Sequence, residues 1–111
     1  MKFKNKVALV TGAGRGLGAE IAKQFAKKGA AVVLVARTDS EINKIAEEIN
    51  SAGGKAIAFA ADISKEENVK SFVKKAIDTF GSVDILVNNA AVHKAIPIKD
   101  LSLEDWNYQI A

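Results

Sequence analysis

The residues with the clearest chemical potential are the glycines of a short run near the amino terminus, Thr11-Gly12-Ala13-Gly14-Arg15-Gly16-Leu17-Gly18. The run follows the apolar stretch 7–10 and precedes a stretch with helical spacing. Glycine tolerates positive φ and has no Cβ, so such a loop can turn tightly and let a phosphate group approach the backbone. A helix that begins here presents free N–H groups and a partial positive charge to an anion. The run therefore predicts a site for the pyrophosphate of a dinucleotide.

The spacing of these glycines differs from the common G-x-G-x-x-G fingerprint. Counting from Gly12 puts Leu17 at the third glycine position, and counting from Gly14 through Gly16 reaches Ala19, which fits only the looser alanine-ended form. The spacing that holds is T-G-x-x-x-G-x-G. A glycine-rich connector without a ligand is the alternative, but four glycines within seven residues at a strand-to-helix junction favour a phosphate loop.

Charge at the end of the second predicted strand indicates which dinucleotide fits. In folds of this kind an acidic residue at that place binds the ribose 2′-OH of NAD, whereas here Ala36 is followed by Arg37. Arg37 could pair with a 2′-phosphate through two N–H donors, and Arg15 could approach the same phosphate. These residues predict NADP over NAD. Two solvated surface arginines are the alternative, and Asp39 is the main argument for NAD unless it belongs to a helix cap.

Strand and helix patterns alternate around these residues. Four apolar runs predict buried strands at 7–10, 31–36, 56–60 and 83–87. Apolar residues at helical spacing predict three intervening helices, which close at Gly29, Gly53-Gly54 and Gly81. Short connections of this type imply right-handed crossovers. The sequence therefore predicts an α/β fold, a doubly wound Rossmann-type parallel sheet of four strands in the order 3-2-1-4.

Apolar stripes and capping signals add detail to the three helices. Their predicted inner faces are Leu17, Ile21 and Phe25 in the first, Ile42, Ile45, Ala46 and Ile49 in the second, and Val69, Phe72, Val73, Ala76, Ile77 and Phe80 in the third. Thr38 with Glu41, and Ser64 with Glu67, fit capping boxes that would open the second and third helices. Pro97 is expected in the loop after the fourth strand.

Together these stretches resemble the short-chain dehydrogenase/reductase family. The glycine loop is similar to its cofactor loop, Ala61-Asp62-Ile63 to the residues after its third strand, and Val83–Ala91 to its fourth strand and Asn-Asn-Ala-Gly motif. Leu103-Glu104-Asp105-Trp106 resembles the start of the next helix, so the resemblance covers essentially the whole chain. It implies that Asp62 binds the adenine, that Asn88 ties neighbouring backbone together, and that Asn89 borders the cofactor ribose. The cofactor-binding residues expected are Gly12, Gly14, Arg15, Gly16, Leu17, Gly18, Arg37, Asp62, Ile63, Asn89, Ala90 and Ala91.

The resemblance implies hydride transfer between NADP(H) and a carbonyl or alcohol substrate in a complete family member, with a tyrosine as general acid/base. The family's catalytic Ser and its Tyr-x-x-x-Lys pair have no counterpart among these 111 residues. Tyr108 is expected to pack beside Trp106, so no catalytic residue is assigned. Ala91 stands where the family usually has Gly, and no role is assigned to His93.

We therefore expect the chain to be a truncated, cofactor-binding portion, residues 1–111, with an incomplete sheet. A non-catalytic nucleotide-binding module acting with a partner chain, and a methyltransferase-like Rossmann protein, are the alternatives.

Composition excludes several other classes of protein. Lys and Arg number 16 against 13 Asp and Glu and are spread along the helices, which argues against a nucleic-acid surface. There is no Cys and a single His, so neither a disulfide framework nor a metal site is expected. No apolar run reaches the length of about 18 residues that a membrane span requires, and 7–10 is too short for a secretory signal. We therefore expect a cytoplasmic protein.

The fourth predicted strand carries an expectation about assembly. Residues 83–87 are almost wholly apolar, as in a central strand, yet no further strand is predicted to pair with them. An open apolar edge favours pairing with another chain. The sequence therefore predicts a self-associating protein, as a homo-oligomer or a larger aggregate, or else a molten monomer rather than a rigid one.

Overall fold

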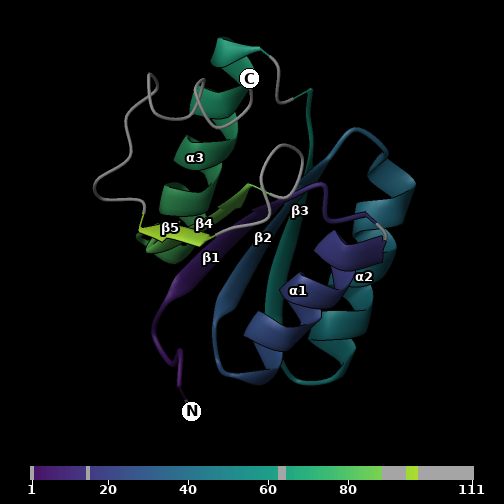
Figure 1. Ribbon diagram of the computed structural model, residues 1–111, viewed down its shortest axis with the longest axis vertical. Coiled ribbons are helices and arrows are strands. Elements are labelled where there is room, and N and C mark those ends of the chain that lie inside the picture. Colours follow the sequence, from purple (N-terminus) through teal and green to yellow (C-terminus); the bar gives the residue numbers. More distant parts are fainter. Residues whose placement is uncertain (1, 15, 63–64, 89–94, 98–111) are drawn as a thin grey trace.

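The computed structural model describes residues 2–14, 16–62, 65–88 and 95–97. Strands and helices alternate as far as the fourth strand (Figure 1). In chain order the elements are β1 (Val7–Thr11), α1 (Gly16–Lys27), β2 (Ala31–Ala36), α2 (Asp39–Ser51), β3 (Lys55–Ala60), α3 (Glu66–Phe80), β4 (Ile85–Asn88) and β5 (Ala95–Pro97).

The sheet has the order β3-β2-β1-β4-β5. The first four of these strands are parallel, with β1 between β2 and β4, so the predicted order 3-2-1-4 is confirmed. Central strand β1 has no exposed residue, as a strand covered on both faces requires.

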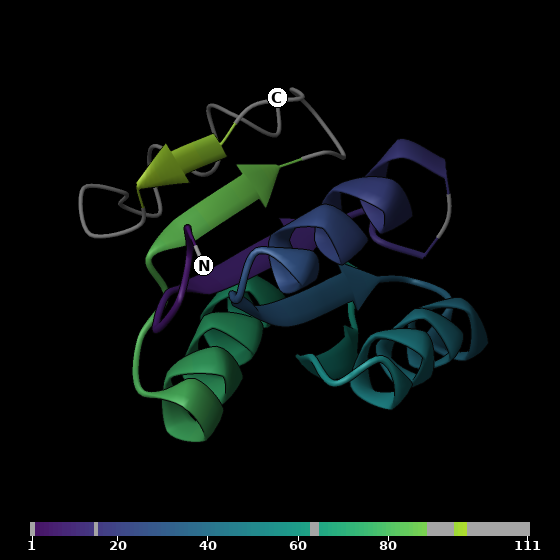
Figure 2. The ribbon, with the colours of Figure 1, turned by 90° about the horizontal axis from the view of Figure 1, so that it is seen from below.

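Two apolar clusters fill the two faces of the sheet. Figure 2 shows α1 and α2 on one face and α3 on the other. Alternate residues of β2 divide between the clusters: Val32 and Leu34 face α1 and α2, and Val33 and Val35 face α3. The two layers therefore follow from the two-residue period of the strands.

Two residues predicted on inner helix faces lie outside them. Leu17 is 55% exposed and Ile77 is 46% exposed. The buried face of α1 is formed instead by the small residues Gly18, Ala19 and Ala22, which let the helix approach the sheet closely. In α3 the residue before Ile77 faces the core, and successive helical residues are turned by about 100°, so Ile77 turns away.

The fourth strand differs from its prediction in two respects. It begins at Ile85 rather than at 83, and it has a second neighbour, β5, in antiparallel pairing over three residue pairs. The prediction that Pro97 lies in a loop is therefore wrong. Proline has no N–H to donate, and an outer strand tolerates it because its outward-facing groups need no partner.

A carboxylate fixes the entry to β4. Oδ2 of Asp84 accepts a hydrogen bond of 2.9 Å from the Val7 N–H and one of 3.1 Å from the Ser82 hydroxyl. The Asp84 N–H in turn donates to the Val7 carbonyl at 2.9 Å. These bonds align the start of β4 with the start of β1.

Helix ends agree only in part with the predicted capping signals. Thr38 is at the N-cap of α2, but its side chain makes no capping hydrogen bond. Helix α3 begins at Glu66 with Lys65 at its N-cap, and Ser64 lies outside the described residues. At the carboxyl ends Gly29, Gly53 and Gly81 have the positive φ angles that such positions favour, and Gly81 is a left-handed C-cap.

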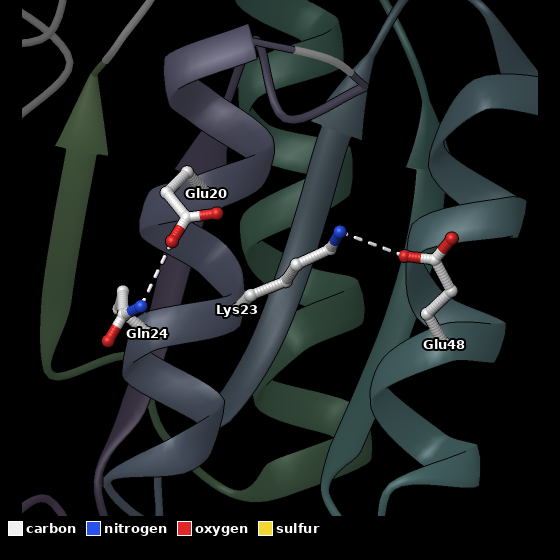
Figure 3. A network of polar contacts seen from close by, with 4 residues as sticks. All are labelled: Glu20, Lys23, Gln24 and Glu48. Carbon is white, nitrogen blue, oxygen red and sulfur yellow. Dashed lines mark hydrogen bonds and ion pairs between the residues drawn. The ribbon is translucent and has the colours of Figure 1, made fainter.

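Helices α1 and α2 are joined by an ion pair, and Gly54 packs closely against a residue of each. Nζ of Lys23 lies 2.9 Å from Oε2 of Glu48 (Figure 3). The hydrogen bond from Lys23, together with its positive charge, lowers the pKa of Glu48 below the ordinary value of 4.5. Gly54 lies under this pair of helices, since a Cβ there would come within 2.8 Å of Ile49 and 3.6 Å of Ala26.

Two asparagine side chains cover the backbone at the two ends of edge strand β3. The Asn50 amide donates to the Ala56 carbonyl at 3.0 Å and accepts from the Ala56 N–H at 2.8 Å, as a neighbouring strand would. Beyond the other end, Nδ2 of Asn68 donates to the Asp62 carbonyl at 3.0 Å. Edge strands with open groups recruit other chains, so this arrangement protects the edge.

We expect Asn50→Ala to destabilise the fold by about 1–2 kcal/mol, because two hydrogen bonds to edge backbone are lost. Urea unfolding followed by circular dichroism measures this. Asn43→Ala, at an exposed asparagine of the same helix, is the matched control for helix propensity. Equal midpoints for the two variants would show that the Asn50 bonds contribute nothing.

Candidate functional site

The strands of the sheet end together at one edge, and the glycine loop starts there. The register pairs Thr11 with Val35 on one side and with Asn88 on the other, and Ala36 with Ala60. Helix α1 leads from β1 to one face of the sheet, whereas α3 leads into β4 from the other face. In open α/β sheets such a change of face leaves a crevice at the carboxyl ends of the strands, where ligands bind.

Two contacts anchor the loop to the sheet. Thr11 is fully buried, and its Oγ1 donates to the Val87 carbonyl at 3.4 Å, across the β1–β4 junction. The Ala13 N–H donates to the Val35 carbonyl at 3.3 Å, and the Ala13 methyl group is buried in the core beneath α1 and α2. The loop therefore has a fixed position over β1 and β2.

The glycines of the loop serve different physical needs. Gly12 and Gly16 have φ angles of 62° and 61°, in the left-handed region that other residues avoid. Gly14 lies against the Glu41 side chain, since a Cβ there would be 2.9 Å from Oε1 of Glu41, and a larger residue would require that side chain to move. Gly18 is buried on the inner face of α1. The sequence pattern predicts the loop, but the structure is needed to show that the individual glycines are there for different physical reasons.

The beginning of α1 suits an anion. No acidic residue lies in its first turn, where one would offset the partial positive charge of the helix terminus. Leu17, in the same turn, exposes 55% of its surface, which makes an apolar rim beside the loop. A phosphate-bearing ligand with an apolar or aromatic part matches this combination.

Two further candidate residues lie beside each other after neighbouring strands. Nη2 of Arg37, just after β2, is 3.7 Å from Oδ1 of Asp62, just after β3. The Arg37 side chain is 79% exposed, whereas that of Asp62 is 35% exposed. The backbone of Asp62 is held in place by the Lys65 N–H at 3.3 Å, in addition to Asn68. The sequence predicts separate roles for Arg37 and Asp62 and does not anticipate that they form a pair.

Several predicted residues fall outside the described part of the chain, namely Arg15, Ile63, Asn89, Ala90 and Ala91, together with His93, Trp106 and Tyr108. Asn88 is the last residue of β4, so the first asparagine of the pair belongs to the strand. Asp39, the residue that argued for NAD, is exposed in the first turn of α2. Over residues 2–14, 16–62, 65–88 and 95–97, no three His, Cys, Asp or Glu residues gather as a metal site would require.

Comparisons with known proteins agree with this architecture. The model of the short chain dehydrogenase family matches residues 6–111. The chain belongs to the short chain dehydrogenase family. A short-chain dehydrogenase/reductase homolog of Bacillus subtilis (strain 168), YusS, is 44% identical over 91% of this chain. An uncharacterized oxidoreductase of Staphylococcus epidermidis is 39% identical over 98% of it.

A similar solved structure is that of a metagenomic short-chain oxidoreductase in complex with NADP, with a TM-score of 0.77 and 40% identity over 83% of this chain. The match spans 94% of YusS, but only 46% of the Staphylococcus protein and 41% of the metagenomic enzyme. The chain thus spans about half the length of its longer relatives. Among the described helices, none has the length and apolar character needed to cross a membrane.

We expect Gly16→Ala to destabilise the chain by about 1–2 kcal/mol, because φ of 61° is unfavourable for an L-residue although nothing crowds the position. Gly16→Asn should lose less, since asparagine tolerates the left-handed region. The midpoints of thermal unfolding of the wild-type chain and the two variants test this order of stability. Equal losses for alanine and asparagine would mean that backbone conformation is not the reason for glycine here.

Proposed function

We propose that the chain binds a nicotinamide dinucleotide over the glycine loop, and that residues 1–111 form the dinucleotide-binding domain of a short-chain dehydrogenase. The family binds nicotinamide dinucleotides, whose ring exchanges a hydride with a carbonyl or alcohol carbon. The observation that carries the proposal is the glycine loop at the carboxyl end of β1, which leads into a helix whose first turn contains no acidic residue. The proposed binding residues are the twelve named from the sequence, from Gly12 to Ala91.

In this proposal the chain's own residues bind and orient the cofactor. Gly12 and Gly16 let the backbone turn beneath the pyrophosphate, and the N–H groups at the start of α1 donate to it. Leu17 covers an apolar part of the ligand, and the carboxylate of Asp62 accepts from the adenine amino group. No catalytic residue is assigned within the chain.

We further propose that NADP is preferred over NAD. The residue at the end of β2 is Ala36, which has no carboxylate to bind a ribose 2′-OH or to repel a 2′-phosphate. Arg37 follows it, exposed and beside the edge at which the strands end. The NADP complex of the similar metagenomic enzyme is consistent with this choice.

The pair between Arg37 and Asp62 does not prevent phosphate binding. An ion pair this exposed contributes about 0–1 kcal/mol, and 3.7 Å is longer than a charged hydrogen bond. A hydrogen bond to a 2′-phosphate contributes about 1.5–3 kcal/mol. A 2′-phosphate is therefore a stronger partner for Arg37 than Asp62 is.

The alternative of a non-catalytic module that acts with a partner chain has no support among the relatives, which carry the names of oxidoreductases. A methyltransferase-like function lacks support for the same reason. We place the protein in the cytoplasm, as its sequence suggests, without a membrane partner.

Self-association through the β4 side of the sheet remains a prediction. Strand β5 pairs with β4 over only three residue pairs. Such a short outer strand gives little protection against pairing with another chain on this side of the sheet. We expect a dimer or larger species in sedimentation velocity at micromolar concentration. A monomer that persists across a hundredfold range of concentration would contradict this.

We expect Arg37→Ala to weaken NADPH binding by about 1.5–3 kcal/mol and to leave NADH binding nearly unchanged, because only NADPH carries the 2′-phosphate. Titration calorimetry of the chain with each cofactor measures both affinities. Lys44→Ala, which removes a positive charge from the exposed side of α2, is the control for general electrostatics. Equal losses with the two cofactors would show that Arg37 does not recognise the 2′-phosphate.

A further inference from the structure

Glu41 lies against the glycine loop. A Cβ built on Gly14 would be 2.9 Å from Oε1 of Glu41 and 3.0 Å from its Cβ. Glu41 belongs to the first turn of α2 and is half-buried. The sequence pattern assigns it to a capping box with Thr38, but Thr38 makes no side-chain capping bond. The structure thus brings the Glu41 side chain against the proposed phosphate loop.

A carboxylate at this place opposes the ligand proposed for the loop. Like charges repel, and the repulsion is greater beside a half-buried group than in open water. Helix α2 starts shortly after β2, at the end of which this fold recognises the cofactor ribose. Glu41 therefore lies on the ribose side of the loop, where the two cofactors differ by the 2′-phosphate.

The position also suits the opposite interaction. In NAD-binding folds of this kind a carboxylate accepts a hydrogen bond from the ribose 2′-OH, and Ala36 cannot supply one here. A carboxylate from the first turn of α2 can do so instead. Arg37 and Glu41 thus carry opposite charges four residues apart, one just after β2 and the other in the first turn of α2.

We propose that Glu41 is a specificity-determining residue that opposes Arg37, so that the site prefers NADPH only moderately and retains NADH. The inference rests on the proposed dinucleotide function. It makes cofactor choice a balance between two side chains rather than the property of Arg37 alone.

The test is the ratio of NADPH to NADH affinity in the wild-type chain and in Glu41→Gln, measured by calorimetry. Glutamine keeps the size of the side chain and removes its charge, so the ratio should rise by about fivefold to tenfold, as expected for one charge near a phosphate. The rise should shrink between 0.05 and 0.5 M salt, at concentrations where the Debye length falls from about 14 to 4 Å. A change of loop shape alone would have no such salt dependence.

Two variants serve as controls. Glu41→Asp keeps the charge and should keep the wild-type ratio within about twofold. Glu47→Gln removes a charge from an exposed position of the same helix, remote from the loop, and should leave the ratio unchanged.

The outcomes separate the two proposals. A wild-type chain that binds neither NADPH nor NADH overturns the dinucleotide function and this inference with it. If the wild-type chain binds the cofactors and Glu41→Gln leaves the ratio unchanged or lowers it, only the inference about Glu41 is wrong. An equal rise after Glu47→Gln would also overturn it, because the effect would then come from net charge.

Discussion

The backbone ladders that β1 makes with β2 and β4 hold the rest of the molecule in place. Together with the helices on both faces of the sheet, these ladders bury every residue of β1. Its side chains must therefore be apolar or hydrogen-bonded internally, and the Thr11 hydroxyl donates to the Val87 carbonyl. Because helices α1 and α3 connect the strands across opposite faces, the crevice forms above the end of this central strand. The position of the candidate site is thus a consequence of strand order.

The second constraint is the small distance between the helices and the parts of the fold they pack against, which only small residues allow. Gly18, Ala19 and Ala22 let α1 lie close to the sheet, and Gly14 lets α2 reach the loop. Close packing of α1 through small residues turns Leu17 outward, which leaves an apolar side chain in water beside the loop. The exposure of Leu17 is unfavourable for folding alone and becomes favourable when a ligand covers it.

The sequence predicts best what depends on local pattern. Strand β2 has its predicted bounds because a β-branched run stands between two clear breaks, and the glycines at helix ends behave as expected. Contacts between distant side chains escape such reasoning. The bond from the Val7 N–H to Asp84, the pair between Arg37 and Asp62, and the approach of Glu41 to Gly14 depend on the folded sheet. Strand β5 was missed because three residues that end in proline carry no strand periodicity.

Helices α1 and α2, two of the helices that begin at the functional edge, differ in the charge of their first turns. The first turn of α2 contains Asp39 and Glu41, which offset the partial positive charge of its terminus. The first turn of α1 contains no acidic residue, although one there would stabilise the helix by about 0.3–1 kcal/mol. A sequence selected for stability alone has no reason to leave one terminus bare and protect the other. The difference is explained when the terminus of α1 is stabilised by a bound phosphate, whose charge a carboxylate at that position would repel.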